Sequence, residues 1–222
     1  MRFSIEIVSL NATFVTAAAV VFGDRAICRL QDIREVDREG AAFVSPANSL
    51  GFMDGGIDAV LRDMFVGCED RLKQRIRELG LLTGLGRPYL PVGSAHWQAV
   101  GPNTVLISAP TMFLPHDVSA TRNAYWAMMA ALCAAADAQV GRLIVPSLCC
   151  GWGRMPVAKA AAQMREALDD WVAGSIPACV HDAGAGWILL PSRDAEQPAN
   201  YDNREIGVGE YADGPVKEVL IS

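Results

Sequence analysis

The stretch SPANSLGFMDGGIDAV, residues 45–60, joins a strand-like run to a helix-like pattern, and it decides how the chain is interpreted. Residues 41–44, Ala-Ala-Phe-Val, are apolar and short, which is typical of a buried strand. Residues 57–65 carry apolar side chains at intervals of three and four, which predicts a helix. A strand followed closely by a helix predicts one unit of an α/β fold, with polar residues and glycines in the connection.

Asn48 and the pair Gly55-Gly56 give this connection its chemical interest. Glycines let the backbone approach a ligand closely, and the unpaired N–H groups at the start of a helix attract anions. The same Gly-Gly junction is also common as a plain structural turn. The stretch alone therefore leaves open whether it binds an anionic ligand.

The rest of the chain alternates between strand-like and helix-like segments. We predict further strands at 3–10, 26–30, 95–100, 105–109 and 143–145, and helices at 12–22, 72–79, 119–136 and 157–171. This alternation predicts an α/β fold, a three-layer α/β/α sandwich with a mixed, largely parallel sheet. In such folds ligands bind at the carboxyl ends of the strands, which is where residues 45–60 lie.

The character of the sequence changes after about residue 176. Residues 176–222 are rich in loop-forming combinations such as Gly-Ala-Gly and Pro-Ser-Arg-Asp, with one short strand-like piece at 216–221. We therefore expect one domain over residues 1–175. The remaining 176–222 would be an extension that packs on this domain or is partly flexible.

The composition narrows the classes of function. The formal net charge is −6, which disfavours a broad nucleic-acid surface but allows a small anion site. The six cysteines form no C-x-x-C pair and no histidine lies near them in sequence, so we expect no metal site and no cofactor. The longest apolar run, 124–136, is shorter than the roughly 18–20 residues of a membrane span. With no leader-like N-terminus, we expect a cytoplasmic protein that makes no membrane contact.

Residues 149–156, Cys-Cys-Gly-Trp-Gly-Arg-Met-Pro, form a second glycine-containing connection from a strand to a helix. Two such loops at one edge of a sheet suggest that a diphosphate is held between them. Neither loop matches G-x-x-x-x-G-K-[ST], which disfavours an ATP-binding P-loop. Neither is a G-x-G-x-x-G with an acid after the next strand, which disfavours an ordinary dinucleotide site.

Taken together, these loops resemble those of the macro domain family. The family typically has N-A-A-N-S at a strand end and then a glycine-rich loop with G-V-D entering a helix. Here Ser-Pro-Ala-Asn-Ser at 45–49 and Gly-Ile-Asp at 56–58 stand in those places. The second family loop, roughly S-T-G-I-Y-G-F-P, fits residues 149–156, and Gln-Asp-Ile-Arg at 31–34 stands where G-D-I-T is often found. The resemblance covers roughly residues 25–173.

The resemblance implies that the protein binds ADP-ribose. By position, Asp32 would accept a hydrogen bond from the adenine amino group, beside the Ile33 backbone, and Asn48 would hold the distal ribose. The phosphates would lie between two sets of backbone N–H groups, those of Gly55, Gly56 and Ile57 and those of Cys150, Gly151, Trp152 and Gly153.

Hydrolytic members of the family use an asparagine and an aspartate to orient the distal ribose and an attacking water. Asn48 and Asp58 occupy the two matching positions, so the resemblance implies that they are the catalytic pair. Such chemistry depends on positioning and on preorganised charge, and this version needs no metal ion.

Several residues depart from the family pattern, among them Pro46 after Ser45, and four of the departures bear on the candidate site. Ser45 replaces the first asparagine, and Trp152 replaces a smaller aliphatic residue. Asp54 replaces a glycine in the phosphate loop, where a carboxylate repels phosphate unless it turns away, for example to cap the following helix. Arg154 also stands at a glycine position, where it would either supply charge to the phosphates or point into solvent.

Three hypotheses follow from these residues. The first is a protein that binds ADP-ribose or a related derivative and hydrolyses ADP-ribose adducts, by O-acyl-ADP-ribose deacylation or de-ADP-ribosylation. Its partner would be an ADP-ribose-like small molecule or an ADP-ribosylated target. The second is a non-catalytic macro-like binding module or assembly component. The third is a structural protein without a nucleotide site, whose tail mediates contacts.

Overall fold

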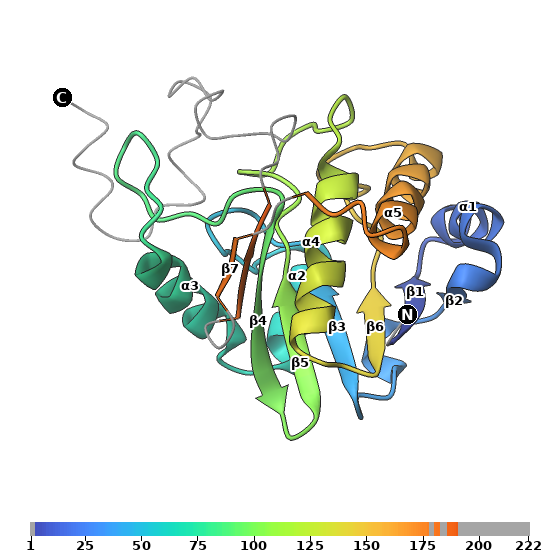
Figure 1. Cartoon of the computed structure of the whole chain (residues 1–222), viewed down its shortest axis with the longest axis horizontal. Helices are drawn as coiled ribbons and strands as arrows, with labels where there is room; N and C mark the ends of the chain where they lie inside the picture. Colours follow the sequence, from blue (N-terminus) through green and yellow to red (C-terminus); the bar gives the residue numbers. More distant parts are fainter. Residues whose placement is uncertain (1–2, 178–179, 183–185, 191–222) are drawn as a thin grey trace.

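The computed structural model describes residues 3–177, 180–182 and 186–190. They form one eight-stranded sheet in the order β2-β1-β6-β3-β5-β4-β8-β7. The first five strands in that order are parallel to their neighbours, and β4, β8 and β7 continue the sheet in antiparallel fashion. Helices cover the two faces of this sheet (Figure 1), so the predicted mixed, largely parallel α/β/α sandwich is confirmed.

The elements follow the predicted alternation closely. The strands are β1 (Ser4–Ser9), β2 (Ile27–Leu30), β3 (Ala41–Ser45), β4 (Ser94–Gly101), β5 (Thr104–Ser108), β6 (Arg142–Val145), β7 (Val180–Asp182) and β8 (Trp187–Leu189). The helices are α1 (Ala12–Phe22), α2 (Gly56–Met64), α3 (Cys68–Leu79), α4 (Asn123–Asp137) and α5 (Val157–Val172), with short 3-10 turns at Gly23–Arg25 and Ile33–Glu35.

Each face of the sheet has its own apolar core. On one face, α1, α4 and α5 pack over strand residues such as Ile5, Val44 and Ile107. On the other face, α2 and α3 pack over residues that include Phe43 and Leu106. The side chains alternate along β3 and β5 because successive residues of a strand point to opposite faces. The end of β3 and the first turn of α2 are joined by a hydrogen bond from Ser45 to Asp58.

The start of one helix was predicted wrongly, and short strands occur within the segment expected to be loop-rich. The helix expected from Ser119 begins only at Asn123, because the backbone before it turns: the Ser119 N–H donates to Asp117 Oδ1 at 2.9 Å and the Thr121 N–H donates to the Val118 carbonyl. Within the segment expected to be loop-rich, β8 pairs with β4 and β7 pairs with β8. The predicted strand-like piece at 216–221 lies outside the described residues.

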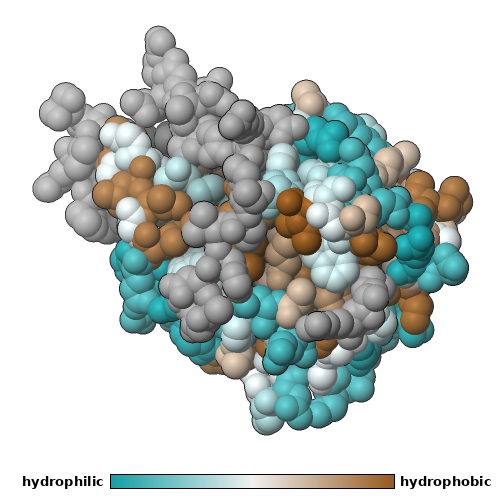
Figure 2. Space-filling model, in the orientation of Figure 1, coloured by the Kyte–Doolittle hydropathy of each residue, from teal (hydrophilic) through white to brown (hydrophobic). Residues whose placement is uncertain are grey.

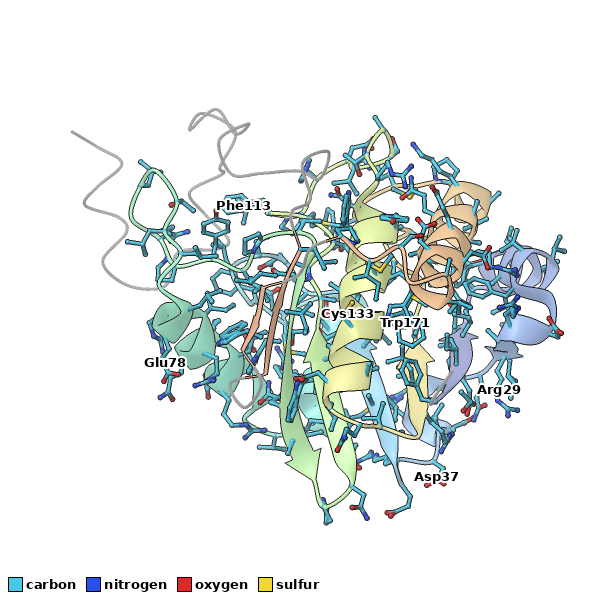
Figure 3. The ribbon with its side chains drawn as sticks, viewed as in Figure 1. Arg29, Asp37, Glu78, Phe113, Cys133 and Trp171 are labelled. Carbon is cyan, nitrogen blue, oxygen red and sulfur yellow. The ribbon has the colours of Figure 1, made fainter. Side chains whose placement is uncertain are left out.

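The amino-terminal half of the sheet is fixed by a buried carboxylate. Glu6 on β1 accepts hydrogen bonds from Arg29 on β2 and from Arg142 on β6, both at 3.0 Å, and Arg142 also approaches Asp37 at 3.6 Å. Figure 3 places Arg29 and Asp37 toward the lower right, whereas Phe113 lies at the upper edge, toward which the parallel strands point. The polar anchor and the loops at the carboxyl ends of the strands are thus at different ends of the molecule.

Apolar side chains on the surface are scattered among hydrophilic ones. Figure 2 shows brown atoms over the loop that follows α3, where Leu82 and Leu85 are exposed. Within the described ranges, no helix combines the length and the apolar character that a membrane crossing requires.

Candidate functional site

A cavity of about 500 Å³ opens at the carboxyl ends of β3, β5 and β6. Three loops form its walls: the connection from β3 to α2, the segment that follows β5, and the connection from β6 to α5. The lining residues are Pro46, Asn48, Phe52, Asp54, Gly55, Gly56, Ile57, Asp58, Thr111, Met112, Pro115, Ser147, Cys149, Gly151, Trp152 and Gly153. The two glycine loops picked out from the sequence therefore face the same space.

The Asn48 side chain is held in one orientation by the backbone around it. Its Oδ1 accepts hydrogen bonds from the N–H groups of Leu50 at 3.0 Å and Phe52 at 3.2 Å. Its own backbone forms a parallel bridge to Met112, and the side chain is buried, with 8% of the residue exposed. Because the oxygen is already engaged, the amide nitrogen is the end of this side chain that can donate to a ligand in the cavity.

Asp58 is held by Ser45, one of the residues that depart from the family pattern. The Ser45 hydroxyl donates to Asp58 Oδ1 at 2.6 Å, across the junction between β3 and α2. Burial raises the pKa of Asp58 to about 7, and the nearby charges of Asp54 and Glu69 add to the rise, while the Ser45 hydrogen bond opposes it. Asp58 is therefore a half-buried carboxyl group that exchanges its proton near neutral pH.

Asp54 does not cap the following helix. The residue at the N-cap position of α2 is Gly55, and no side chain caps this end of the helix. Asp54 is exposed and lines the cavity, and its charge adds to the rise in the pKa of Asp58. A negative charge at the lining opposes the binding of an anion in this cavity.

The backbone at the start of α2 requires glycine. Gly56 has φ +55°, a left-handed conformation that residues with a Cβ adopt only at a cost. This conformation turns the chain from the cavity wall into the helix. The N–H groups of Gly55, Gly56 and Ile57 thus lie beside the cavity at a helix start, where they favour negative charge.

The second loop is tightly wound. Cys149 and Arg154 both have positive φ, 62° and 50°, and the Met155 N–H donates to the Cys149 carbonyl at 3.0 Å. A Cβ on Gly153 would lie 2.6 Å from that carbonyl oxygen and 2.8 Å from Val118, so no larger residue fits there without a shift. This loop is a rigid wall whose shape depends on Gly153.

Two residues predicted from this loop do not line the cavity. The thiol of Cys150 lies 3.3 Å from the Leu148 carbonyl oxygen, and burial raises the pKa of this thiol to about 11. It is Cys149 that lines the cavity instead. Arg154 is exposed and is also absent from the lining, although its charge helps to lower the pKa of Asp117.

Trp152 stands at the mouth of the cavity with 67% of its surface exposed. A Cβ on Gly55 would lie 3.9 Å from its Nε1, so the indole bridges from the second loop toward the first. An exposed indole is an uncommon use of a large apolar side chain. Its position over the cavity suits contact with the flat face of a ligand.

Asp32 and Ile33 lie away from this cavity, at the end of β2. Asp32 caps a 3-10 turn by accepting the Arg34 N–H at 2.9 Å, and its carboxylate pairs with the Arg34 guanidinium. These contacts with Arg34 lower the pKa of Asp32 to about 2. Ile33 is buried. In the sheet β2 is three strands from β3, or about 14 Å at the usual strand spacing, so Asp32 could meet only the far end of an elongated ligand.

The sequence analysis missed the third wall of the cavity. Thr111, Met112 and Pro115 follow β5, another parallel strand whose carboxyl end lies at the same edge as that of β3. The Thr111 hydroxyl donates to the Pro46 carbonyl at 2.9 Å, which joins this wall to the first loop. The strand predicted at 105–109, which ends at Pro110, could have indicated this wall. Each parallel strand that ends at this edge is followed by a loop, so the loop after residue 109 was a candidate for lining the cavity.

Among the described residues, no group of three histidine, cysteine, aspartate or glutamate side chains is placed to hold a metal ion. No lysine or arginine from the part of the chain that the structure describes lines the cavity. The electrostatic character of the cavity thus comes from two carboxyl groups and from backbone N–H groups at the two glycine loops.

Comparison with known proteins identifies a similar fold but says nothing about the activity of this chain. No family model matches the sequence, and no curated protein matches it. Among solved structures, the macrodomain of Mycobacterium tuberculosis DarG superposes with a TM-score of 0.52 at 15% identity, over 64% of this chain and 88% of the DarG macrodomain chain. At that identity the likeness concerns the fold, and the chain has a macrodomain-like fold.

Proposed function

We propose that the cavity between the two glycine loops binds ADP-ribose or a derivative of ADP-ribose. The observation that supports this most directly is that Asn48, Asp58 and both glycine loops line one cavity, at the edge of a macrodomain-like sheet where ligands of such folds bind. The distal ribose would lie at Asn48 and the diphosphate between the glycine loops. The adenine would lie toward Asp32, at the end of β2.

In this proposal the backbone holds the phosphates. The N–H groups of Gly55, Gly56 and Ile57 would face those of Gly151, Trp152 and Gly153 across the cavity, and no lysine or arginine of the described residues lines it. Trp152 would cover the ligand from the second loop. Arg154, being exposed, would contribute only long-range attraction.

Hydrolysis of an ADP-ribose adduct would use Asp58 as a general base. In its ionised form Asp58 would accept a proton from the attacking water molecule, and Asn48 would orient the distal ribose through its amide nitrogen. With an ADP-ribosylated target, the water would attack the ribose carbon that is bonded to the target; that bond would break, and the target would leave and take up a proton. With an O-acyl-ADP-ribose, the water would attack the ester carbonyl carbon; the bond from this carbon to the ribose oxygen would break, and the ribose hydroxyl would leave with a proton. A pKa of about 7 suits this role, because a base works best when its pKa lies near the working pH. Ser45 would keep the carboxylate oriented through its hydrogen bond.

A non-catalytic binding module is the second candidate, and Asp54 favours it. Asp54 lines the cavity, and its charge adds to the rise in the pKa of Asp58. The two acids would therefore weaken phosphate binding and keep part of the Asp58 population protonated. A cavity of this kind could bind a ligand moderately without turning it over.

Titration calorimetry with ADP-ribose tests the proposal. We expect heat of binding with the native protein and a loss of at least tenfold in affinity for Asn48→Ala, since a buried donor to the ribose is removed. Asp54→Asn should bind more tightly than the native protein, by about threefold to tenfold, because a repulsive charge is removed. No heat and no thermal shift at millimolar ADP-ribose would refute the binding proposal.

Turnover of an O-acyl-ADP-ribose or of an ADP-ribosylated peptide separates the two candidates. If the protein is a hydrolase, Asp58→Asn should abolish turnover while ADP-ribose affinity is kept or improved. If it is a binding module, the native protein and Asp58→Asn should both lack turnover. Unchanged hydrolysis in Asn48→Ala and Asp58→Asn would place the chemistry elsewhere.

A further inference from the structure

A second, smaller cavity adjoins the first and differs from it in charge. It has a volume of about 140 Å³ and is lined by Leu50, Phe52, Lys73, Ile76, Arg77, Arg87 and Pro88. Phe52 lines both cavities, so its ring is the wall between them. Counting described residues only, the lining of the first cavity has two acids and no lysine or arginine, whereas that of the second has three cations and no acid.

The three cations of the second cavity differ in how they are held. Lys73 on α3 pairs with Glu69 at 3.1 Å, one helical turn earlier, and its Nζ lies 4.1 Å from the centre of the Phe52 ring. This cation–π contact fixes the aromatic wall against the helix. Lys73 thus serves partly as a structural residue of the wall.

Arg77 and Arg87 are the cations whose charge is not used inside the described structure. Arg77 is exposed near the end of α3, and Arg87 is half-buried in the loop after that helix. Within residues 3–177, 180–182 and 186–190, neither guanidinium has an acidic partner within 4 Å. Arg75, by contrast, pairs with Glu78, which lies on the outer side of α3 in Figure 3.

We infer that Lys73, Arg77 and Arg87 form a binding site for an acidic side chain of a target protein, next to the residue that carries ADP-ribose. This inference rests on the proposed function, because the first cavity would hold the ADP-ribose itself. The part of the target attached to the distal ribose would leave the first cavity past Phe52. A carboxylate that follows it would meet two guanidinium groups, whose planar forks match a carboxylate.

The size and charge of the second cavity favour a peptide over a nucleic acid. A volume of about 140 Å³ lies below the roughly 300–1,000 Å³ of pockets for drug-sized ligands, so it suits one acidic side chain rather than a nucleotide. Its apolar walls, Leu50, Ile76 and Pro88, suit the methylene groups of such a side chain. The formal net charge of −6 also disfavours association with a polyanion.

The test compares two peptides that carry ADP-ribose through a non-hydrolysable linker, one with glutamates beside the modified residue and one with glutamines. We expect the native protein to bind the glutamate peptide about tenfold more tightly at low salt. The preference should fall several-fold in Arg77→Gln and in Arg87→Gln and vanish in the double variant. Free ADP-ribose should bind all of these proteins equally. The matched control is Arg25→Gln, an exposed arginine in the 3-10 turn after α1, which should leave the preference unchanged.

Several outcomes would overturn the inference, and they differ from failure of the proposed function. Equal binding of the two peptides to the native protein, or a preference that survives in the double variant, would refute the anion site. The inference would also be refuted if Arg77 and Arg87 were needed only for the binding of an ADP-ribosylated oligonucleotide and not for that of the peptides. If free ADP-ribose does not bind, the anion site is tested with the unmodified glutamate peptide at millimolar concentration, followed by NMR. Chemical-shift changes at Arg77 and Arg87 that the glutamine peptide does not cause would support the anion site. If the glutamate peptide causes no such changes, the anion site is refuted.

Discussion

Replacing Asp58 by asparagine should stabilise the protein above neutral pH. The pKa of Asp58 is raised from 3.8 to about 7, mainly by burial, so the folded protein holds a proton on this group that the unfolded chain has released. Stability is therefore lost as the pH rises from about 4 to about 7, and the loss persists above that range. The rise in pKa corresponds to about 4 kcal/mol as an upper limit. Because Asp58 is half-buried and solvent screens part of this cost, we expect a gain of about 2 kcal/mol.

Asparagine is the right probe because it keeps the shape of the side chain and an oxygen that can accept the Ser45 hydroxyl, which now donates at 2.6 Å. Urea unfolding of the native protein and of Asp58→Asn should give equal stabilities near pH 4. The difference should grow in favour of the variant up to about pH 7.5. Other groups that titrate in this range, such as His96, are common to both proteins and cancel in the difference. A variant that is less stable at every pH, or a difference that shrinks as the pH rises, would refute the reasoning.

Three further predictions concern the walls of the site and its neighbourhood. Trp152→Ala should leave the free energy of unfolding within about 0.5 kcal/mol of the native value, because the indole is 67% exposed, while calorimetry should show about tenfold weaker binding of ADP-ribose. Gly153→Ala should cost about 2 kcal/mol in urea unfolding and weaken binding, because the new Cβ would lie 2.6 Å from the Cys149 carbonyl oxygen; an unchanged protein would mean that the loop is softer than its geometry implies. As the pH falls from 6.5 to 4, the variant His96→Gln should lose less stability in urea unfolding than the native protein. Burial lowers the pKa of His96 to about 4, so in this range His96 takes up a proton when the native protein unfolds, and this favours the unfolded state.

The sequence predicted the sheet well because its strands are short apolar runs bounded by turn residues, and its helices repeat every three or four residues. The two strands that it missed, β7 and β8, are three residues long each. They gain their stability from pairing with β4 and with each other, and such pairing with distant residues leaves little local signal. The start of α4 at Asn123 was also predicted wrongly. The residues just before it have helix propensities that allow a helix, but they form hydrogen-bonded turns instead.

The candidate site was predicted in its parts but not in its electrostatics. Asn48, Asp58 and the glycine pairs follow from strand ends and loop spacing, because a parallel sheet brings all such ends to one edge. The role of Ser45 did not follow, since it depends on β3 and α2 meeting so that a hydroxyl lies 2.6 Å from a carboxylate. A substitution that seemed to weaken the family pattern thus supplies a partner for the candidate base.

The distribution of charge connects these observations. Among the described residues, the lining of the proposed diphosphate cavity contains two acids and no lysine or arginine, while Arg77 and Arg87 line the second cavity beyond Phe52. If electrostatic attraction to phosphate alone determined where the cationic side chains lie, they would be expected to line the first cavity. Backbone N–H groups at glycine loops can hold a diphosphate without side-chain charge. No lysine or arginine is then needed beside Asp58, whose pKa is about 7. A cation beside Asp58 would lower this pKa, and Asp58 would then be a weaker base near neutral pH. If the proposed function is correct, cations outside the cavity would allow the protein to hold an anionic ligand and still keep a carboxyl group that exchanges its proton near neutral pH.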